Sequence, residues 1–169
     1  MVLLDIVLAE HSKAQCEVIV RWVGKNQNHF NQLLELVIKG KPILSQRASW
    51  PLCNAAIANP LLMKEHWKTV LKQAMKEKLP RGVKRNMIKI LAEIPFPKKL
   101  EGNVMDFCFQ QLENPLEEIA VKSWAMKILM KMAMSYPDIL PELKLIVEDQ
   151  YDLGSAGFKA QAKRILAMK

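Results

Sequence analysis

Four lysines recur at every fourth position of one segment and are the first candidates for a functional surface. They are Lys64, Lys68, Lys72 and Lys76, within residues 61–78. Four residues advance an α-helix by about 400°, so each lysine would lie about 40° round the helix from the previous one. A row of this kind can contact the phosphates of a nucleic acid, or it can be the solvated side of a helix.

The next segment adds more positive charge to this region. It contributes Arg81, Lys84, Arg85 and Lys89. Residues 64–89 therefore hold nine basic residues and only two acids. The whole chain has a formal net charge of +8, and residues 61–110 carry eleven Lys/Arg against five Asp/Glu. An uneven positive field favours anionic partners without identifying one.

Four tryptophans are many for a chain of 169 residues. Tryptophan is large and amphipathic, so an exposed ring can anchor a protein partner or stack on a base. Trp50 and Trp124 are the candidates for partner binding, because each lies near the basic residue that recurs in the repeats described below, Arg47 and Lys122. The alternative is that these rings, with Trp22 and Trp67, pack between helices.

Residue types that support catalysis do not occur at useful spacings. The three histidines have no partner at metal-ligand spacing, and three widely separated cysteines make no disulfide framework. There is no glycine-rich phosphate loop and no GxSxG sequence. Glu148, Asp149 and Asp152 close a helical pattern and are expected to face solvent. We therefore expect no metal, no cofactor and no enzymatic activity.

The cysteines and the hydropathy of the chain indicate where in the cell the protein is expected. An odd number of cysteines within apolar helical patterns is typical of a reducing cytoplasm. No apolar run approaches the roughly 18–20 residues that a membrane span needs. The sequence therefore predicts a cytoplasmic protein without a membrane partner.

An internal repeat indicates which elements position these residues. Four segments resemble one another: QRASWPLCNAAIA, VKRNMIKILAEIP, VKSWAMKILMKMA and FKAQAKRILAMK. When they are aligned on Arg47, Lys84, Lys122 and Lys159, the spacings are 37, 38 and 37 residues. A weaker copy places Lys13 34 residues before Arg47. Each copy has apolar residues at helical spacing, so we expect one helix in each.

Second helices are expected between these copies, in NHFNQLLELVIK, LLMKEHWKTVLKQAMKEK, LEGNVMDFCFQQLE and DILPELKLIVEDQ. Prolines fall at the boundaries, because proline lacks the N–H group and restricts the residue before it. Ser12 and Asn26 are expected N-caps, and Gly40 is placed to end a helix. No segment alternates with period two, so we predict an all-α chain of antiparallel helix pairs that stack as a solenoid.

The segment ENPLEEIAVKSWAMKILMKM resembles the first helix of a HEAT repeat. In that family a turn of Asp/Asn-Pro type precedes Val-Arg, with Ala and Leu following at helical spacing. Asn114-Pro115, Val121-Lys122, Ala125 and Leu129 occupy these positions. The resemblance implies an α/α superhelix of about four and a half repeats over residues 12–169, preceded by a capping helix over 1–11, in a single domain over 1–169.

The resemblance also carries expectations about surfaces. It implies that the second helices, with the lysine row, line a concave face used for interaction. It further implies that the basic residue of each repeat pairs with the turn of a neighbouring repeat.

The basic solenoid is similar in architecture to the HEAT-like alkylpurine DNA glycosylases, which place a catalytic aspartate one helical turn beyond a tryptophan. Here Asn54 follows Trp50 by four residues. An amide cannot act as a carboxylate base or stabilise a developing cation by its charge, so glycosylase chemistry is not expected. Residues 152–163 also echo the signature loop of the fumarase superfamily, but its Met-Pro and Asn are missing.

The sequence therefore favours a non-enzymatic helical-repeat scaffold that binds a macromolecule, preferably a protein, through its concave face. The alternative is a module that binds the DNA backbone through residues 64–89. A glycosylase-like or lyase enzyme is the third and least favoured hypothesis.

Overall fold

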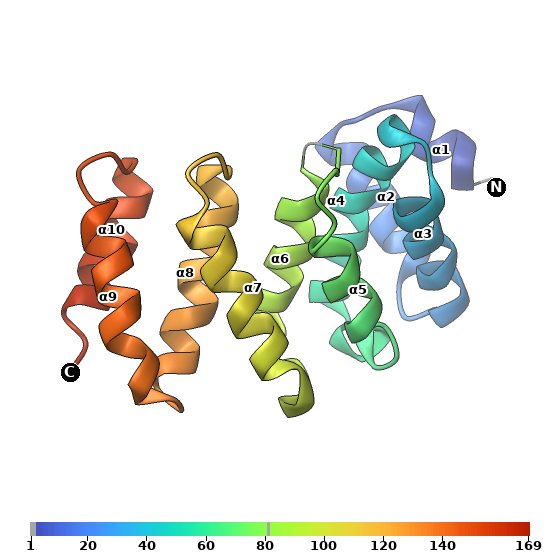
Figure 1. Cartoon of the computed structure of the whole chain (residues 1–169). Helices are drawn as coiled ribbons and strands as arrows, with labels where there is room; N and C mark the ends of the chain where they lie inside the picture. The colour runs from blue at the N-terminus through green and yellow to red at the C-terminus, as the bar shows by residue number, and fades with distance from the viewer. Residues whose placement is uncertain (1–2, 81) are drawn as a thin grey trace. The chain divides into compact units, whose positions relative to one another are not determined.

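The computed structural model describes residues 3–80 and 82–169, and every regular element in those ranges is helical. The chain divides into two compact units, residues 1–95 and 96–169. In each unit the helices form antiparallel pairs, as Figure 1 shows. The prediction of an all-α helical-repeat solenoid is confirmed. The assignment of residues 1–169 to a single domain stays a prediction.

The elements follow the predicted repeat. Unit 1 comprises α1 (Leu3–Ala9), α2 (Lys13–Val23), α3 (Gln27–Lys39), α4 (Pro42–Ala58), α5 (Trp67–Ala74) and α6 (Val83–Glu93), with a 3₁₀ turn at Pro60–Met63. Unit 2 comprises α7 (Glu101–Glu113), α8 (Ile119–Ala133), α9 (Leu140–Asp149) and α10 (Ala156–Leu166), with 3₁₀ turns at Lys98–Leu100 and Pro137–Ile139. The even-numbered helices from α2 to α10 are the first helices of the repeats, and α3, α5, α7 and α9 are the second helices.

The predicted helix ends are formed as expected. The Ser12 hydroxyl accepts a hydrogen bond from the Gln15 amide, and the Asn26 side chain accepts one from the His29 amide, each at 3.1 Å. These bonds satisfy amides that have no partner within the helix. Gly40 ends α3 with an ordinary φ of −66°. A Cβ there would lie 2.2 Å from the Leu36 carbonyl oxygen, so glycine is needed for space rather than for a left-handed backbone.

The segment that carries the lysine row is not one continuous helix. After Pro60 the chain forms a 3₁₀ turn, and bonds from Lys64 N to Leu61 O (3.2 Å) and from His66 N to Met63 O (2.9 Å) carry it to Trp67. The α-helix then lasts only eight residues. The prediction of a helix over 61–78 is therefore wrong, because bonds between residues three apart replace the α-helical pattern at both ends.

Buried polar contacts hold the helix pairs of unit 1 together. Asn86 of α6 donates a 2.8 Å hydrogen bond to the Ser49 hydroxyl of α4. The Ser45 hydroxyl and the Gln73 amide group both donate to the Val37 carbonyl, at 2.6 and 3.4 Å. That carbonyl lies in the last turn of α3, where backbone carbonyls have no N–H partner within the helix. Each buried polar side chain named here therefore has a partner, which fixes how α3, α4, α5 and α6 pack.

Within each unit, the first helices pack more extensively on one another than the second helices do. In unit 1, α4 lies between α2 and α6 and contacts both, and in unit 2 α10 packs against α8. Contacts between α3 and α5 and between α7 and α9 are sparse. The prediction that the second helices and the lysine row line a concave face stays a prediction.

Candidate functional site

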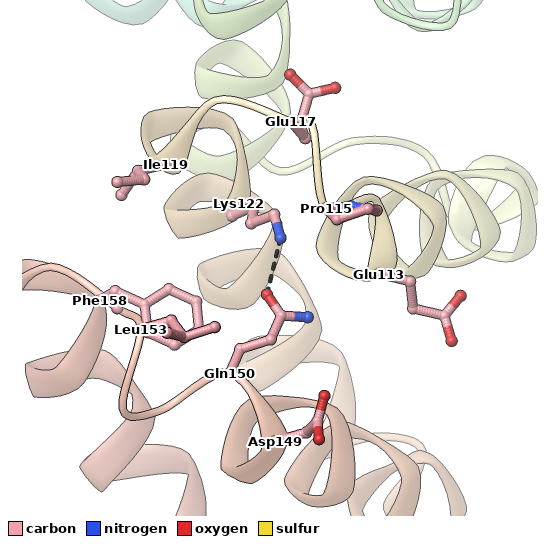
Figure 2. A pocket seen from close by; sticks show the side chains of 10 residues that line it. Glu113, Pro115, Glu117, Ile119, Lys122, Asp149, Gln150, Leu153 and Phe158 are labelled. Atoms are coloured by element: carbon pink, nitrogen blue, oxygen red, sulfur yellow. Dashed lines mark hydrogen bonds between the residues drawn. The ribbon is translucent and has the colours of Figure 1, made fainter.

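A pocket of about 340 Å³ lies in unit 2, where α7 and α9 end and α8 and α10 begin (Figure 2). Two connecting turns, residues 114–118 and 150–155, and the first turns of α8 and α10 surround it. The pocket thus lies between consecutive repeats of the same unit, at the end of the helices where the first helix of each repeat starts.

A buried lysine forms part of the pocket wall. The Lys122 ammonium donates a 2.8 Å hydrogen bond to Gln150 Oε1 (Figure 2). Gln150 Nε2 in turn donates a 2.9 Å bond to the Leu112 carbonyl. The two bonds join α8, the turn after α9 and the last turn of α7. Lys122 is only 8% exposed, and this burial lowers its pKa, while Glu117 acts in the opposite direction. Lys122 therefore links adjacent repeats, as the sequence analysis expected of the basic position.

Carboxylates line one side of the pocket. Glu113 is the last residue of α7 and Asp149 is the last residue of α9, and both are exposed. Glu117 lies in the turn between α7 and α8. The carbonyl end of a helix carries partial negative charge, so acids at these ends are electrostatically unfavourable. No basic residue occupies the last turn of α7 or α9 to offset them.

Apolar side chains line the opposite side. Figure 2 shows Ile119, Leu153 and Phe158 on one side of the Lys122–Gln150 bond, with Glu113 and Asp149 on the other. Leu153 is 91% exposed and Ile119 is 52% exposed, whereas Phe158 is buried at 3%. Leu116, in the same turn as Glu117, is 92% exposed. The pocket is therefore amphipathic.

A glycine keeps the apolar side open. A Cβ on Gly154 would lie 2.4 Å from Phe158 Cδ1, so any larger residue would displace the ring. The neighbouring Ser155 caps α10 by accepting a 3.2 Å hydrogen bond from the Phe158 amide. The glycine and the cap together fix the Phe158 ring in the pocket wall.

Sequence reasoning did not find this pocket. It treated Asp149 and Asp152 as solvated residues at a helix end and assigned no role to Gln150. The pocket is formed by two turns about one repeat apart, and no local motif marks their approach. The available signal was that α7 and α9 end in acids, against the helix dipole.

In unit 1, Arg47 and Trp50 lie on α4 and contact the chain that precedes α2. Arg47 Nη1 donates a 2.5 Å hydrogen bond to the Leu8 carbonyl. The Trp50 ring packs edge-on against His11, with centroids 5.7 Å apart. Both side chains are half-buried, so Arg47 and Trp50 help to fix α1 onto the first-helix layer.

Asn54 occupies the position that resembles the glycosylase aspartate. Its amide donates to the Cys16 sulfur at 3.4 Å. Burial raises the pKa of Cys16, while the Asn54 hydrogen bond acts in the opposite direction. Burial also raises the pKa of Cys53 to about 12. Thiols in such surroundings stay protonated and are weak nucleophiles.

The basic residues of the sequence analysis lie on more than one element. Lys68 and Lys72 are exposed on α5, whereas Lys64 precedes this helix and Lys76 follows it. Arg85 is exposed on α6, and Lys84 and Lys89 are half-buried there and make contacts of their own. Lys89 lies close enough to Cys16 and Cys53 to oppose the rise in their pKa. Arg81 lies outside the described residues. The basic residues are therefore distributed over several consecutive elements, and anion binding by them stays a prediction.

The two candidate tryptophans belong to different units. Trp50 is in unit 1, and Trp124 is on α8 of unit 2, where the Lys127 ammonium lies 5.1 Å from its ring centroid. Trp67 is buried at 7% exposure, and Trp22 stacks on His29 at 3.9 Å. Trp22 and Trp67 therefore pack against neighbouring residues, and partner binding by Trp50 and Trp124 stays a prediction.

His66 joins the start of α5 to α3. Its Nε2 atom lies 2.8 Å from Asn31 Oδ1 and 3.1 Å from Gln27 Nε2, and Gln27 also donates to the Leu62 carbonyl at 3.1 Å. Burial lowers the pKa of His66, while Glu65 acts in the opposite direction. His66 therefore belongs to a polar network that links α5 to α3.

Two kinds of site are absent from the residues that the structure describes. Among them, no three His, Cys, Asp or Glu side chains are grouped so that they could hold a metal ion. Within residues 3–80 and 82–169, no helix has the length and apolar character needed to span a membrane.

Comparison with known families supports the repeat assignment. A HEAT repeat domain model matches residues 6–169, which is nearly the whole chain and includes both units. Searches of curated proteins and of solved structures gave no significant match. Together with the helix pairs and their period, the family match shows that this chain belongs to the HEAT repeat family.

Proposed function

We propose that the protein is a non-enzymatic scaffold that binds another protein through the pocket of unit 2. One observation carries this proposal: among the described residues, the two most exposed large apolar side chains are Leu116, in the turn that contributes Pro115 and Glu117 to the pocket, and Leu153, which lines the pocket; they are 92% and 91% exposed. Exposed apolar groups that gather beside a polar pocket are typical of protein interaction sites. HEAT repeats generally mediate protein interactions, which supports the same conclusion.

Affinity capture with matched variants tests this function. Wild-type protein and the double variant Leu116→Ser plus Leu153→Ser would be used to capture proteins from lysate of the source cells, with quantification by mass spectrometry. We expect at least one protein to be enriched by the wild type and lost with the variant.

The control is Leu61→Ser plus Leu145→Ser, because these leucines are 87% and 69% exposed but lie outside the two turns that surround the pocket. This variant should retain the partner. Equal enrichment by the wild type and both variants would contradict a role for the pocket.

A second candidate function is binding of the nucleic acid backbone by unit 1. The observation in its favour is that unit 1 carries fifteen Lys/Arg against seven Asp/Glu, whereas unit 2 carries ten of each. Release of counterions would make such binding weaken steeply with salt. This candidate no longer depends on one helical row, since Lys64, Lys68, Lys72 and Lys76 are exposed on consecutive short elements.

Anisotropy of a labelled duplex of about 20 base pairs, at about 50 and 200 mM salt, tests this candidate. The variant Lys68→Glu plus Lys72→Glu should weaken binding at the lower salt without lowering the melting temperature. Lys163→Glu plus Arg164→Glu, which reverses two exposed charges on α10, should not weaken it. No binding by the wild type at the lower salt would exclude this function.

A further inference from the structure

We propose that the unit 2 pocket takes a basic amphipathic segment of the protein partner, with one apolar side chain against Leu153 and Phe158 and Lys or Arg side chains beside Glu113 and Asp149. This inference rests on the proposed function and names the chemistry of the partner. Three observations support it. The pocket is negatively charged, its acids lie at helix ends where they are electrostatically unfavourable, and its carboxylates and apolar side chains lie on opposite sides.

Charge is the first argument. The pocket is lined by three carboxylates and one ammonium group, so it is negative although the chain has a net charge of +8. Unit 2 as a whole is neutral, yet six of its ten acids lie in residues 113–118 and 148–152, which contain no Lys or Arg. A pocket with this charge attracts cationic side chains and repels an acidic segment or a nucleic acid.

The position of the acids is the second argument. Glu113 and Asp149 are each the last residue of a second helix, where the helix dipole disfavours negative charge. Most other long helices of the chain have the opposite arrangement, with Arg21, Lys39, Lys131, or Lys163 and Arg164 in the last turn. A residue choice that opposes stability at two adjacent helix ends indicates selection for binding.

The separation of the linings is the third argument. Carboxylates and exposed apolar side chains lie on opposite sides of the Lys122–Gln150 bond (Figure 2). A segment whose cationic and apolar side chains point in different directions can contact both sides at once. A volume of about 340 Å³ accommodates one or two side chains rather than a folded domain.

Lys122 adds a polar anchor for the backbone of such a segment. An ammonium group has three N–H donors, and in the described structure Gln150 accepts the hydrogen bond from one of them. Lys122 is 8% exposed and lies at the boundary of the two linings. A peptide carbonyl between the acidic and apolar sides would be within its reach.

Peptide binding to the full chain tests the inference. The probe is a fluorescein-labelled twelve-residue peptide of alternating Leu and Lys/Arg, measured by anisotropy at low salt. Two analogues are measured beside it, one with every Lys/Arg replaced by Glu and one with every Leu replaced by Ser. We expect the probe to bind, the acidic analogue not to bind, and the serine analogue to bind more weakly than the probe.

Two charge variants locate the binding. Glu113→Gln plus Asp149→Asn should weaken the probe by about fivefold, the size expected for two partly exposed ion pairs. Asp138→Asn plus Glu142→Gln removes the same charge from exposed positions of unit 2 outside the pocket and should have little effect. The pocket variant should not lower the melting temperature, because it also removes unfavourable charges from two helix ends.

Several results would overturn the inference. They are the absence of probe binding, equal binding by the wild type and the pocket variant, or equal binding of the probe and its acidic analogue. Self-association of the chain that the pocket variant abolishes, without probe binding, would assign the pocket to a second copy instead. If the leucine variants lose a captured partner while the charge variants keep it, the proposed function stands and only the basic partner chemistry fails.

Discussion

The two units are built from the same helix pair but present different surface chemistry. Unit 1 holds all of the net positive charge, and unit 2 is neutral, with three of its ten acids lining one pocket. The residue at the basic position of the repeat is nevertheless used in a similar way in both units. Arg47 bonds to the Leu8 carbonyl in unit 1, and Lys122 bonds to Gln150 in unit 2. The repeat pattern therefore specifies packing, and we propose that residues outside the pattern specify the partner.

The largest expected effect is a loss of stability on filling the space beside Gly154 in the unit 2 pocket. Gly154→Ala places a Cβ 2.4 Å from Phe158 Cδ1, so we expect a loss of about 2 kcal/mol in the free energy of unfolding from overpacking. Urea unfolding would measure it.

Gly102→Ala is the matched control for this change. Gly102 lies in α7 with nothing within 4 Å of the added Cβ, so the same substitution should stabilise by roughly 0.5–1 kcal/mol. Equal effects of the two substitutions would contradict the packing described for the pocket.

The next effect compares the basic position in the two units. Lys122→Met removes a bond to Gln150 from a side chain that is 8% exposed, and we expect a loss of about 1 kcal/mol. Arg47→Met removes a bond from a more exposed side chain, so its cost should be within roughly 0.5 kcal/mol. Denaturant unfolding of both variants measures the two losses. A larger loss for Arg47→Met than for Lys122→Met would contradict the stronger structural role given to Lys122.

A smaller effect of opposite sign is expected at the acidic helix ends. Glu113→Gln plus Asp149→Asn should stabilise the protein by roughly 0.3 kcal/mol per residue, since each neutral amide removes a charge that opposes the helix dipole. Thermal unfolding at low salt would measure the gain. A destabilised variant would show that these carboxylates have a structural role.

Much of the fold could be predicted from the sequence, because the determinants are local. The 37-residue period, the caps at Ser12 and Asn26 and the proline boundaries all depend on neighbouring residues. The short α5 was missed because hydrophobic spacing continues through the 3₁₀ turn after Pro60. The pocket was missed because Lys122 and Gln150 are 28 residues apart and meet only when the repeats stack.

The smallest expected effect is a response to mild acid that is confined to unit 1. Burial lowers the pKa of His66 from 6.5, so the native state binds fewer protons than the unfolded chain just below that pH. The stability contributed by neutral His66 is complete above pH 6.5 and is lost as the pH falls through its folded pKa. Unit 2 contains none of the three histidines.

Amide hydrogen exchange at pH 7 and pH 5, corrected for intrinsic rates, would measure this difference. Protection should fall around α3 and α5 more than around α8 and α10. His66→Asn should reduce the change in unit 1. An equal fall in both units would exclude His66 as its source.

Site-specific photo-crosslinking tests the central claim most directly. A benzophenone amino acid would replace Leu153 at the unit 2 pocket or Leu61 in unit 1, two positions that are 91% and 87% exposed. The crosslinked products would be identified from lysate by mass spectrometry. The account predicts a discrete protein adduct from position 153, joined through a peptide rich in Lys/Arg and Leu, and no such adduct from position 61. Adducts at both positions in equal yield, or an acidic crosslinked peptide at position 153, would contradict it.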